Sequence, residues 1–552
     1  MLLTARCYRV TSGIVMATFA LAAPAIAQAQ NLSKGYQMLL NRGFQIQAVS
    51  VKENGFHLQP GTNNAGGQTG GYLDAGYNTV NWCYSNVNNA PNSNVSALGA
   101  APGIPWARWV DNQADMPPMG AEAPYMSSLV GLSLADEQDL NNQTIRDAAV
   151  QWFTNAKANP AFNNTILYTN SWGGQIADAP LIDFVNRAKP DMMSFDTYPF
   201  QSTWVSGGTG NAKDYAARPD WANMTSFYSE LRRYRDISKG AGIPFSVYTQ
   251  TFSSVQDYNQ TVYHDPSPSE MRLNNFAAVA FGAKQVVGFT YNTGASSLFV
   301  NDHHGGGDAT PTPLYEEQKL INKRLKNWGN TLVRLRPVDD WSTDGTTTST
   351  LMLRGKHYDA GTKTEVLDPL PINFIGNANN PAAAFSSWQS NRYDTYLRGW
   401  TITNIGNKNI NPDTGRKMEG DVFLSWFKPL DESFDGPNYT GEVYMILVNG
   451  LSDPTGSVAD CTQTVRLNFF STMPGIQMLD PETGSVININ VPQDQATGRK
   501  LWDVTLGGGD AILFKFNTGA PFIGVPEPAS VGMLMLGLVP VVIARPRRSR
   551  GH

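Results

Sequence analysis

Residues 165–196, with the sequence TILYTNSWGGQIADAPLIDFVNRAKPDMMSFD, decide the fold of this chain. Thr165–Thr169 and Met192–Asp196 are short runs of β-branched, aromatic and long apolar residues, which is typical of buried strands. Between them, Ala179–Ala188 carries apolar residues at helical spacing. A strand, a helix and a second strand in this order form a unit in which the two strands are parallel.

The same unit recurs on both sides of this segment. The segment between the first two strands is rich in Gly and Asn and is expected to be a long loop, and Pro117, Pro118 and Pro124 interrupt the helix of the third unit. Eight strands in series favour a closed (β/α)8 barrel over an open parallel sheet. The further strands are predicted at Phe44–Val51, Thr79–Tyr84, Trp106–Val110, Val130–Leu134, Phe245–Thr249 and Val286–Tyr291, and the further helices at Ile145–Ala156, Phe227–Ile237 and Met271–Ala283.

The pattern changes after Pro337, where strand-like runs separated by turn residues replace the alternation of strands and helices. We therefore predict four parts: a signal peptide (1–29), the barrel (30–337), an all-β sandwich (338–517), and a linker with a sorting tail (518–552). The strands of the sandwich are expected at Ser349–Arg354, Asp421–Phe427, Val443–Asn449, Thr464–Phe470, Ile487–Val491 and Ala511–Phe516.

The N-terminus has the three features of a secretory signal peptide. Arg6 and Arg9 precede an apolar run from Ile14 to Ile26, and the run ends in small residues at alternate positions up to Ala29. The apolar run is short for a bilayer span, so cleavage is favoured over a retained anchor.

The C-terminus resembles the PEP-CTERM sorting signal. Val525-Pro526-Glu527-Pro528 is followed by an uncharged apolar stretch to Ala544 and then by four arginines between Arg545 and Arg550. The resemblance implies transient insertion into the inner membrane, with the arginines on the cytoplasmic side, and cleavage near Pro-Glu-Pro by an exosortase-type transpeptidase. The alternative is a permanent C-terminal anchor. The expected destination is the cell surface, the extracellular matrix or the outer envelope.

Composition narrows the class of ligand. The net charge is −5 and no basic stripe occurs, which argues against a nucleic-acid partner. Aromatic residues make up 11% of the chain, and Asn and Gly are abundant, which suits a surface that binds neutral polar ligands such as sugars. Cys83 and Cys461 are expected to be two buried thiols, with an interdomain disulfide as the alternative.

No cofactor or metal is predicted, because the chain contains neither a C-x-x-C nor an H-E-x-x-H motif. Asp302-His303-His304, with Asp308, lies in a Gly-rich segment after the eighth strand. We expect this segment to be a lid over the cleft rather than a metal site.

In a barrel of this kind, the residues of the active site lie at the carboxyl ends of the strands. Carboxylates, amides and aromatic side chains converge there in this chain, which is the usual composition of a sugar-cleaving cleft. The candidates for catalysis are Glu137 and Asp196, and the candidates for substrate binding are Trp82, Asp136, Asn170, Trp172, Tyr198, Gln250, Tyr291 and Asn292.

These motifs resemble clan-A glycoside hydrolases, in particular family 42 and its relatives. In that clan "D-E-P" ends strand 4, "D-x-Y-P" ends strand 6, "P-x-x-E-x-R" opens the seventh helix and "G-A-K" leads into strand 8. This chain carries Asp136-Glu137, Asp196-Thr197-Tyr198-Pro199, Pro268-Ser269-Glu270-Met271-Arg272 (at slightly shorter spacing) and Gly282-Ala283-Lys284.

The resemblance assigns Glu137 as the acid/base and implies a nucleophilic Glu at the end of strand 7. That position holds Gln250. An amide cannot serve as a nucleophilic carboxylate, so the retaining double displacement is in doubt.

Glycoside hydrolysis needs one carboxylic acid and one carboxylate. Asp196 is the best remaining partner for Glu137, and a separation of about 6.5–9.5 Å would permit inversion through an activated water. The structural alternatives are that Asp136-Glu137 caps the next helix, that Asp196 binds loop amides, and that Glu270 is a helix cap or an ion-pair partner.

We therefore expect an exported enzyme that hydrolyses O-glycosidic bonds in a polysaccharide or glycoconjugate. The alternative is a catalytically inactive protein that binds carbohydrate or builds the envelope or matrix on a hydrolase scaffold. Gln250 is the main argument for the alternative.

Overall fold

The structure is a computed structural model of the whole chain. It describes residues 32–51, 56–62, 66–83, 95, 97–110, 115–134, 136–204, 215–217, 220–254, 262–292, 296–300, 310–338, 349–370, 395–430 and 439–525. The predicted signal peptide, the sorting tail from residue 526 and the segment from Asp302 to Asp308 lie outside these residues.

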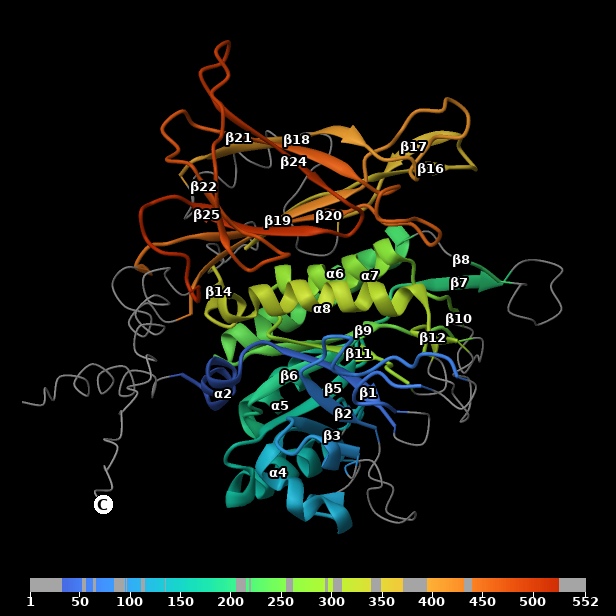
Figure 1. Cartoon of the computed structure of the whole chain (residues 1–552), viewed down its shortest axis with the longest axis vertical. Helices are drawn as coiled ribbons and strands as arrows, with labels where there is room; N and C mark the ends of the chain where they lie inside the picture. Colours follow the sequence, from blue (N-terminus) through green and yellow to red (C-terminus); the bar gives the residue numbers. More distant parts are fainter. Residues whose placement is uncertain are drawn as a thin grey trace, which may run out of the picture.

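Eight parallel strands close into a barrel in the order β1-β11-β9-β6-β5-β4-β3-β2, which confirms the predicted barrel (Figure 1). Each predicted barrel strand coincides with an observed one to within a few residues. The barrel strands are β1 (Gln45–Ser50), β2 (Thr79–Trp82), β3 (Trp106–Val110), β4 (Leu129–Leu134), β5 (Ile166–Trp172), β6 (Met192–Asp196), β9 (Phe245–Gln250) and β11 (Gln285–Phe289).

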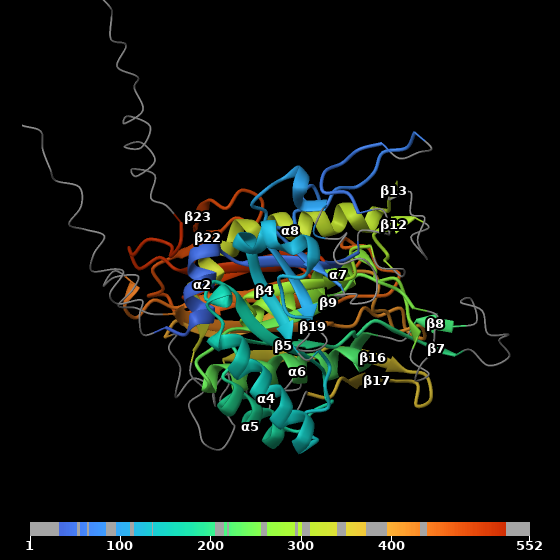
Figure 2. The same cartoon turned by 90° about the horizontal axis from the view of Figure 1, so that it is seen from below.

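Helices cover the second half of the barrel more regularly than the first. Figure 2 shows α4 and α5 on one flank and α8 on the other. Where the three prolines interrupt the third unit, the chain forms a 3-10 helix, η5 (Gly120–Ser128), because Pro124 lacks the N–H that an α-helix requires. The helices are α2 (Lys34–Arg42), α4 (Gln143–Ala158), α5 (Asp178–Ala188), α6 (Asp220–Gly240), α7 (Pro268–Ala280) and α8 (Pro313–Leu332), with the short 3-10 helices η3 (Ala97–Ala100) and η6 (Pro160–Phe162).

Short strands extend from the loops of the barrel. β10 (Val262–Tyr263), β7 (Gln201–Trp204) and β8 (Tyr215–Ala217) form a three-stranded sheet in that order. β12 (Phe299–Val300) pairs with β13 (Thr310–Pro311). The first of these sheets joins the loop after β6 to the loop after β9, and it therefore borders the mouth of the barrel.

The C-terminal region consists of antiparallel sheets, as predicted. A seven-stranded sheet packs against a three-stranded sheet, β18-β21-β24, and β16 pairs with β17. The strands are β14 (Leu335–Pro337), β15 (Thr350–Leu353), β16 (Lys356–Asp359), β17 (Thr364–Leu367), β18 (Leu397–Ile405), β19 (Asp421–Pro429), β20 (Tyr444–Gly450), β21 (Gln463–Phe469), β22 (Ile476–Leu479), β23 (Val486–Ile489), β24 (Lys500–Leu506) and β25 (Ala511–Phe516).

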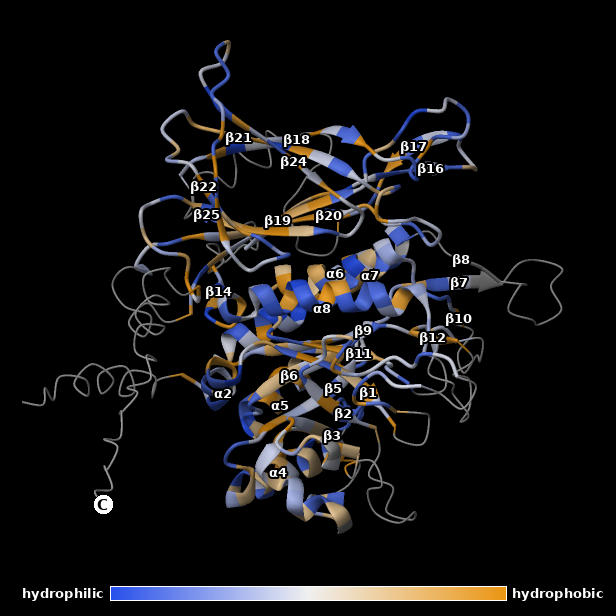
Figure 3. Ribbon diagram, viewed as in Figure 1, coloured by the Kyte–Doolittle hydropathy of each residue, from blue (hydrophilic) through white to orange (hydrophobic). Residues whose placement is uncertain are grey.

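The seven-stranded sheet is buried on both faces. In β20, Tyr444 and Ile446 belong to the same apolar core as the barrel, whereas Met445 and Leu447 belong to the core of the sandwich. Successive side chains of a strand point to opposite faces, so this alternation places the sheet between α6–α8 and the second sheet (Figure 1). Burial on both faces explains why β19 and β20 are apolar along most of their length (Figure 3).

Residues 518–525 differ from their prediction as a linker. Phe522 and Ile523 are buried, the Ile523 N–H donates to the Tyr444 hydroxyl at 3.1 Å, and the Ile523 carbonyl accepts from Thr331. This segment is therefore part of the packed body. Its sequence resembles a linker because few of its residues are apolar: Phe522 and Ile523 are buried in the core, and Val525 packs against it.

Cys83 and Cys461 are both buried and do not form a disulfide with each other. Across the part of the chain that the structure describes, no helix combines the length and apolarity needed to cross a bilayer.

Candidate functional site

Strands β4, β5 and β6 are neighbours in the barrel, and their carboxyl ends carry the central polar residues of the mouth. Trp172, the last residue of β5, is in register with Asp196, the last residue of β6. Gly173 follows, and its N–H donates to the Asp196 carbonyl at 2.7 Å. A Cβ atom at Gly173 would lie 1.8 Å from the Thr197 hydroxyl oxygen, so only glycine lets the two strands stay this close.

Asp196 is buried, with 4% of its surface exposed. Its Oδ1 accepts from the Asn170 amide Nδ2 at 3.2 Å, and its carboxyl group is in hydrogen-bonding contact with the carboxyl group of Glu137. Burial, followed by the negative charges of Glu137 and Asp136, raises the pKa of Asp196 well above its ordinary value. Two carboxyls in contact require a proton between them, because two adjacent buried negative charges repel.

Glu137 is exposed at the rim and has a left-handed backbone, with φ at 48°. A non-glycine residue in this conformation is strained by about 1 kcal/mol or more, and hydrogen bonds hold it there. Its N–H donates to the Asn170 carbonyl at 2.9 Å, and its carbonyl accepts from Gln175 at 2.7 Å. Helix capping does not explain Glu137, because the cap of α4 is Asn142.

Glu137 and Asp196, the two candidate acids, lie near each other at the mouth of the barrel. Asn170 links the two residues, because its carbonyl accepts from the Glu137 N–H at 2.9 Å and its Nδ2 donates to Asp196 at 3.2 Å. The negative charge of Glu137 therefore adds to the burial that raises the pKa of Asp196.

Asp136, the residue before Glu137, is partly buried. Its negative charge contributes to the raised pKa values of Tyr168, Tyr248 and Tyr198, for which burial is the larger cause, as well as to that of Asp196. Asp136 is thus a third carboxylate facing the centre of the barrel.

Aromatic side chains line the mouth. Trp172 is 52% exposed, which leaves much of its ring open for stacking. Tyr198 is partly buried, and its ring contacts Phe289 with the centroids 5.7 Å apart. Phe289 is stacked parallel to Trp109 at 6.3 Å. Trp172 and Tyr198 therefore both lie at the mouth of the barrel.

Sequence reasoning missed Trp109, Phe289 and Tyr263 at the mouth. Trp109 could have been found, because it stands one residue before the end of a predicted strand. Tyr263 had no sequence signal: burial raises its pKa, followed by the charges of Asp196 and Glu137, so it lies near these acids although it belongs to β10.

Trp82 and Tyr291 are not available as stacking platforms, which corrects their prediction. Trp82 is 1% exposed and packs edge-on against Phe56 at 4.9 Å. Tyr291 is equally buried and contacts Tyr72 and Phe299 at 5.0 Å. Both side chains belong to the apolar core that surrounds the barrel.

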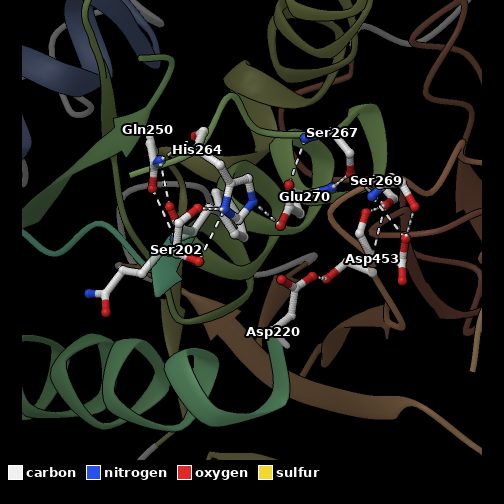
Figure 4. Close-up of polar contacts among 12 residues, drawn as sticks. Ser202, Asp220, Gln250, His264, Ser267, Ser269, Glu270 and Asp453 are labelled. Carbon is white, nitrogen blue, oxygen red and sulfur yellow. Dashed lines mark hydrogen bonds and ion pairs between the residues drawn. The ribbon is translucent and has the colours of Figure 1, made fainter. Parts of the chain in front are cut away.

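Asn292 and Gln250 bind backbone instead of reading sugar hydroxyls, which corrects both predictions. The Asn292 amide accepts from the Val51 N–H at 2.9 Å and donates to the Val51 carbonyl at 2.7 Å. The Gln250 Oε1 accepts from the Phe200 N–H at 3.0 Å. The Gln250 Nε2 lies 3.1 to 3.3 Å from the carbonyls of Phe200, Phe252 and His264 (Figure 4).

Beyond Gln250, a buried polar network leads to the β sandwich (Figure 4). His264 Nδ1 contacts the Gln201 carbonyl at 3.1 Å, and His264 Nε2 contacts the Glu270 carboxylate at 2.8 Å. Glu270 caps α7 through Ser267, as its structural alternative predicted, and is in hydrogen-bonding contact with Asp220.

The network ends in the loop after β20, where the Ser452 hydroxyl donates to Asp220. Burial raises the pKa of Glu270 to about 7 and raises that of Asp220 further above its ordinary value, whereas burial lowers the pKa of His264. The network therefore couples the starts of α6 and α7 to the sandwich through shared protons.

Within the residues described, no group of three or more His, Cys, Asp or Glu side chains is arranged to hold a metal ion.

A comparison with protein families matches residues 147–328, from α4 to α8, to the glycosyl hydrolase 42 family, described as beta-galactosidase. The match covers about a third of the chain and includes Asp196, Gln250 and Glu270. No curated protein matches the chain.

Three solved structures with a similar arrangement are named as glycosidases. A rhamnosidase from Novosphingobium sp. PP1Y is 12% identical with a TM-score of 0.32, and the match covers 71% of this chain and 41% of the rhamnosidase. An endo-beta-1,4-mannanase from Thermotoga petrophila is 10% identical with a TM-score of 0.34, covering 74% and 96%. An endo-alpha-mannosidase from Bacteroides thetaiotaomicron is 11% identical with a TM-score of 0.30, covering 45% and 75%.

Because the TM-scores are low, these similarities add nothing to what the barrel topology already establishes. This chain also spans less than half of the rhamnosidase. The family match and the closed eight-stranded barrel together support a glycoside hydrolase-like fold for this chain.

Proposed function

We propose that the protein hydrolyses O-glycosidic bonds at the mouth of its barrel, with the Glu137–Asp196 pair as the source of the proton for the leaving oxygen. The placement of both acids around Asn170 supports this proposal: the Asn170 carbonyl accepts from the Glu137 N–H at 2.9 Å, and its Nδ2 donates to Asp196 at 3.2 Å. Cleavage of a glycoside needs an acid that is still protonated near neutral pH, and a buried carboxyl beside a second carboxyl meets that condition.

The two residues of the pair differ in exposure, and we therefore assign them different roles. Asp196 is buried and fixed by Asn170, so it holds the proton in place. Glu137 is exposed and can reach a substrate that enters from solvent. Trp172, on the adjacent strand, offers an open aromatic face on which a sugar ring can stack.

The Glu137→Gln variant tests the proposal, because an amide cannot deliver the proton. We expect hydrolysis of glycosides with poor leaving groups to fall by about 100-fold or more, while sugar affinity measured by calorimetry remains. Asp139→Asn is the matched control, since Asp139 is an exposed carboxylate on the same loop. Unchanged turnover in Glu137→Gln would dismiss Glu137 as the acid.

A second candidate function is carbohydrate binding without catalysis, and Gln250 favours it. Its amide is occupied by backbone groups, so the position that would hold a nucleophile in the resembled clan has become structural. Affinity for glycans without product, across a broad panel of polysaccharides, would select this function.

We propose that the protein is exported and sorted to the cell surface. The support is the signal-peptide pattern of residues 1–29 and the Pro526-Glu527-Pro528 tail followed by arginines. Intact-mass analysis of the mature protein from its host tests this proposal. A mass that retains both ends would reject it.

A further inference from the structure

The turn that follows β5 is held next to Asp196. The Gln175 N–H donates to the Trp172 carbonyl at 3.0 Å and closes the turn, and Gly174 inside it has φ at 79°, which favours glycine. The Gly173 N–H donates to the Asp196 carbonyl at 2.7 Å. The turn is therefore bound to the end of the neighbouring strand β6.

The side chain of Gln175 folds back over this turn and uses both ends of its amide. Its Oε1 accepts from the Trp172 N–H at 3.1 Å, and its Nε2 donates to the Glu137 carbonyl at 2.7 Å. Because the backbone bond already closes the turn, the side chain adds a link to the loop after β4. One amide therefore joins the backbone of the exposed aromatic residue to the backbone of the candidate acid.

The backbone of Glu137 is left-handed, with φ at 48°. A residue with a side chain keeps this conformation only where its surroundings enforce it. Residues at the end of β5 and in the turn bind both of its backbone polar groups: the Asn170 carbonyl accepts from its N–H at 2.9 Å, and Gln175 donates to its carbonyl. The second of these bonds comes from a side chain, so a substitution can remove it.

A second side chain, from the same loop as Glu137, holds the backbone of Gln175. The Asn141 Nδ2 donates to the Gln175 carbonyl at 2.7 Å, and the Asn141 Oδ1 accepts from the Ala177 N–H at 2.9 Å. The loops after β4 and β5 are thus bound to each other at Glu137 and again at Asn141. The amide of Gln175 therefore starts from a backbone that is itself held in place.

We infer that Gln175 is a positioning residue, whose amide holds the backbone of Glu137 in the conformation from which its carboxyl group reaches the substrate. This inference rests on the proposed function, in which Glu137 is the exposed member of the acid pair. Gln175 acts through Glu137 and takes no part in the chemistry itself.

The loss of this bond should show in the step that needs the acid. Alkyl glycosides need a proton on the leaving oxygen, whereas the dinitrophenolate of a dinitrophenyl glycoside leaves without one. Displacement of Glu137 should therefore lower kcat/KM for alkyl glycosides by about 10-fold or more and leave kcat/KM for dinitrophenyl glycosides unchanged. Both bonds of the Gln175 amide are exposed, so the urea midpoint of unfolding should stay the same.

Two variants of the full-length protein test the inference on glycosides of a sugar that the wild type hydrolyses. Gln175→Met removes both bonds at nearly the same side-chain length. Gln175→Glu keeps the acceptor for the Trp172 N–H but places an oxygen against the Glu137 carbonyl. Gln151→Met is the matched control, because Gln151 is an exposed residue of α4 whose amide donates to Asn155. We expect both Gln175 variants to lose activity with alkyl glycosides alone, and the control to lose none.

A crystal structure of the Gln175→Met variant gives a readout that does not depend on activity, because the Glu137 backbone should leave its left-handed conformation. An equal loss with both kinds of glycoside, no loss with either, or an unchanged Glu137 backbone would overturn the inference and leave the proposed hydrolysis standing. A wild-type protein that hydrolyses no glycoside would overturn the proposed function and this inference with it.

Discussion

Replacing Gln250 by Glu would restore the carboxylate that the resembled clan places at the end of strand 7. The structure predicts that this change destabilises the protein and creates no nucleophile. The Gln250 Nε2 has two hydrogens and lies within hydrogen-bonding distance of three backbone carbonyls, so it makes two good bonds there. A glutamate at this position places an oxygen against all three.

The magnitude follows from these contacts. Losing two buried hydrogen bonds and leaving their acceptors unpaired costs about 2–4 kcal/mol, and the new carboxyl avoids a larger penalty only by staying protonated. A protonated carboxyl has one O–H donor, so it restores one of the two bonds. We therefore expect the stability loss of Gln250→Glu to be smaller at pH 5 than at pH 8.

Urea unfolding followed by Trp fluorescence measures this loss, and hydrolysis of aryl glycosides measures activity. Gln493→Glu is the matched control, because this exposed side chain donates one bond to a backbone carbonyl, that of Gly498, and we expect a change within about 0.5 kcal/mol. A stable Gln250→Glu variant with increased hydrolysis would refute the reasoning, since it would reveal a dormant nucleophile position with room for a charge.

Three further predictions concern the junction with the sandwich. Burial raises the pKa of Glu270 to about 7, so between pH 4.5 and 7 the folded protein keeps a proton that the unfolded chain has released. The free energy of unfolding should therefore fall by about 1.4 kcal/mol per pH unit over this range from this group alone. The Glu270→Gln variant should flatten that slope in urea titrations at several pH values. Asp510→Ala should cost about 3 kcal/mol in urea unfolding, because it leaves Arg272 and Arg324 without a shared partner at 2.6 to 2.9 Å. Phe522→Ala should cost about 3–5 kcal/mol in thermal unfolding and expose residues 518–525 to proteases.

The barrel could be predicted from the sequence because its strands are buried on both faces. Such strands appear as short apolar runs, and the helices between them carry their own period. The seven-stranded sheet was predictable for the same reason. The position of residues 518–525 was not, because docking of a short segment depends on a surface that only the folded body creates.

The site was predicted best where a strand end fixes the side chain. The inward-facing positions at the ends of β5 and β6 hold Asn170, Trp172 and Asp196. All three side chains reach the mouth of the barrel. The prediction for Trp82 was wrong because neighbouring residues of a strand point to opposite faces of the sheet. Asn81 donates to Gln47 inside the barrel, so the Trp82 side chain points outward. When a strand is buried on both faces, its sequence does not alternate between polar and apolar residues, so the sequence does not show which residues point into the barrel.

Among the residues that the structure describes, two pairs of carboxyl groups lie together, Glu137 with Asp196 and Glu270 with Asp220, and the two pairs differ in their exposure. Glu270 and Asp220 are both buried, and their partners are the cap of α7, His264 and Ser452. Asp220 also lines a pocket at this junction, and its contacts with Glu270 and Ser452 hold the starts of α6 and α7 against the sandwich. Glu137 is exposed while Asp196 is buried, so their proton can pass to a bound substrate and be replaced from water. In both pairs the repulsion between two carboxylates favours keeping one proton. In the buried pair this proton contributes to the contacts of the junction, whereas in the pair with an exposed member it is available to a bound substrate.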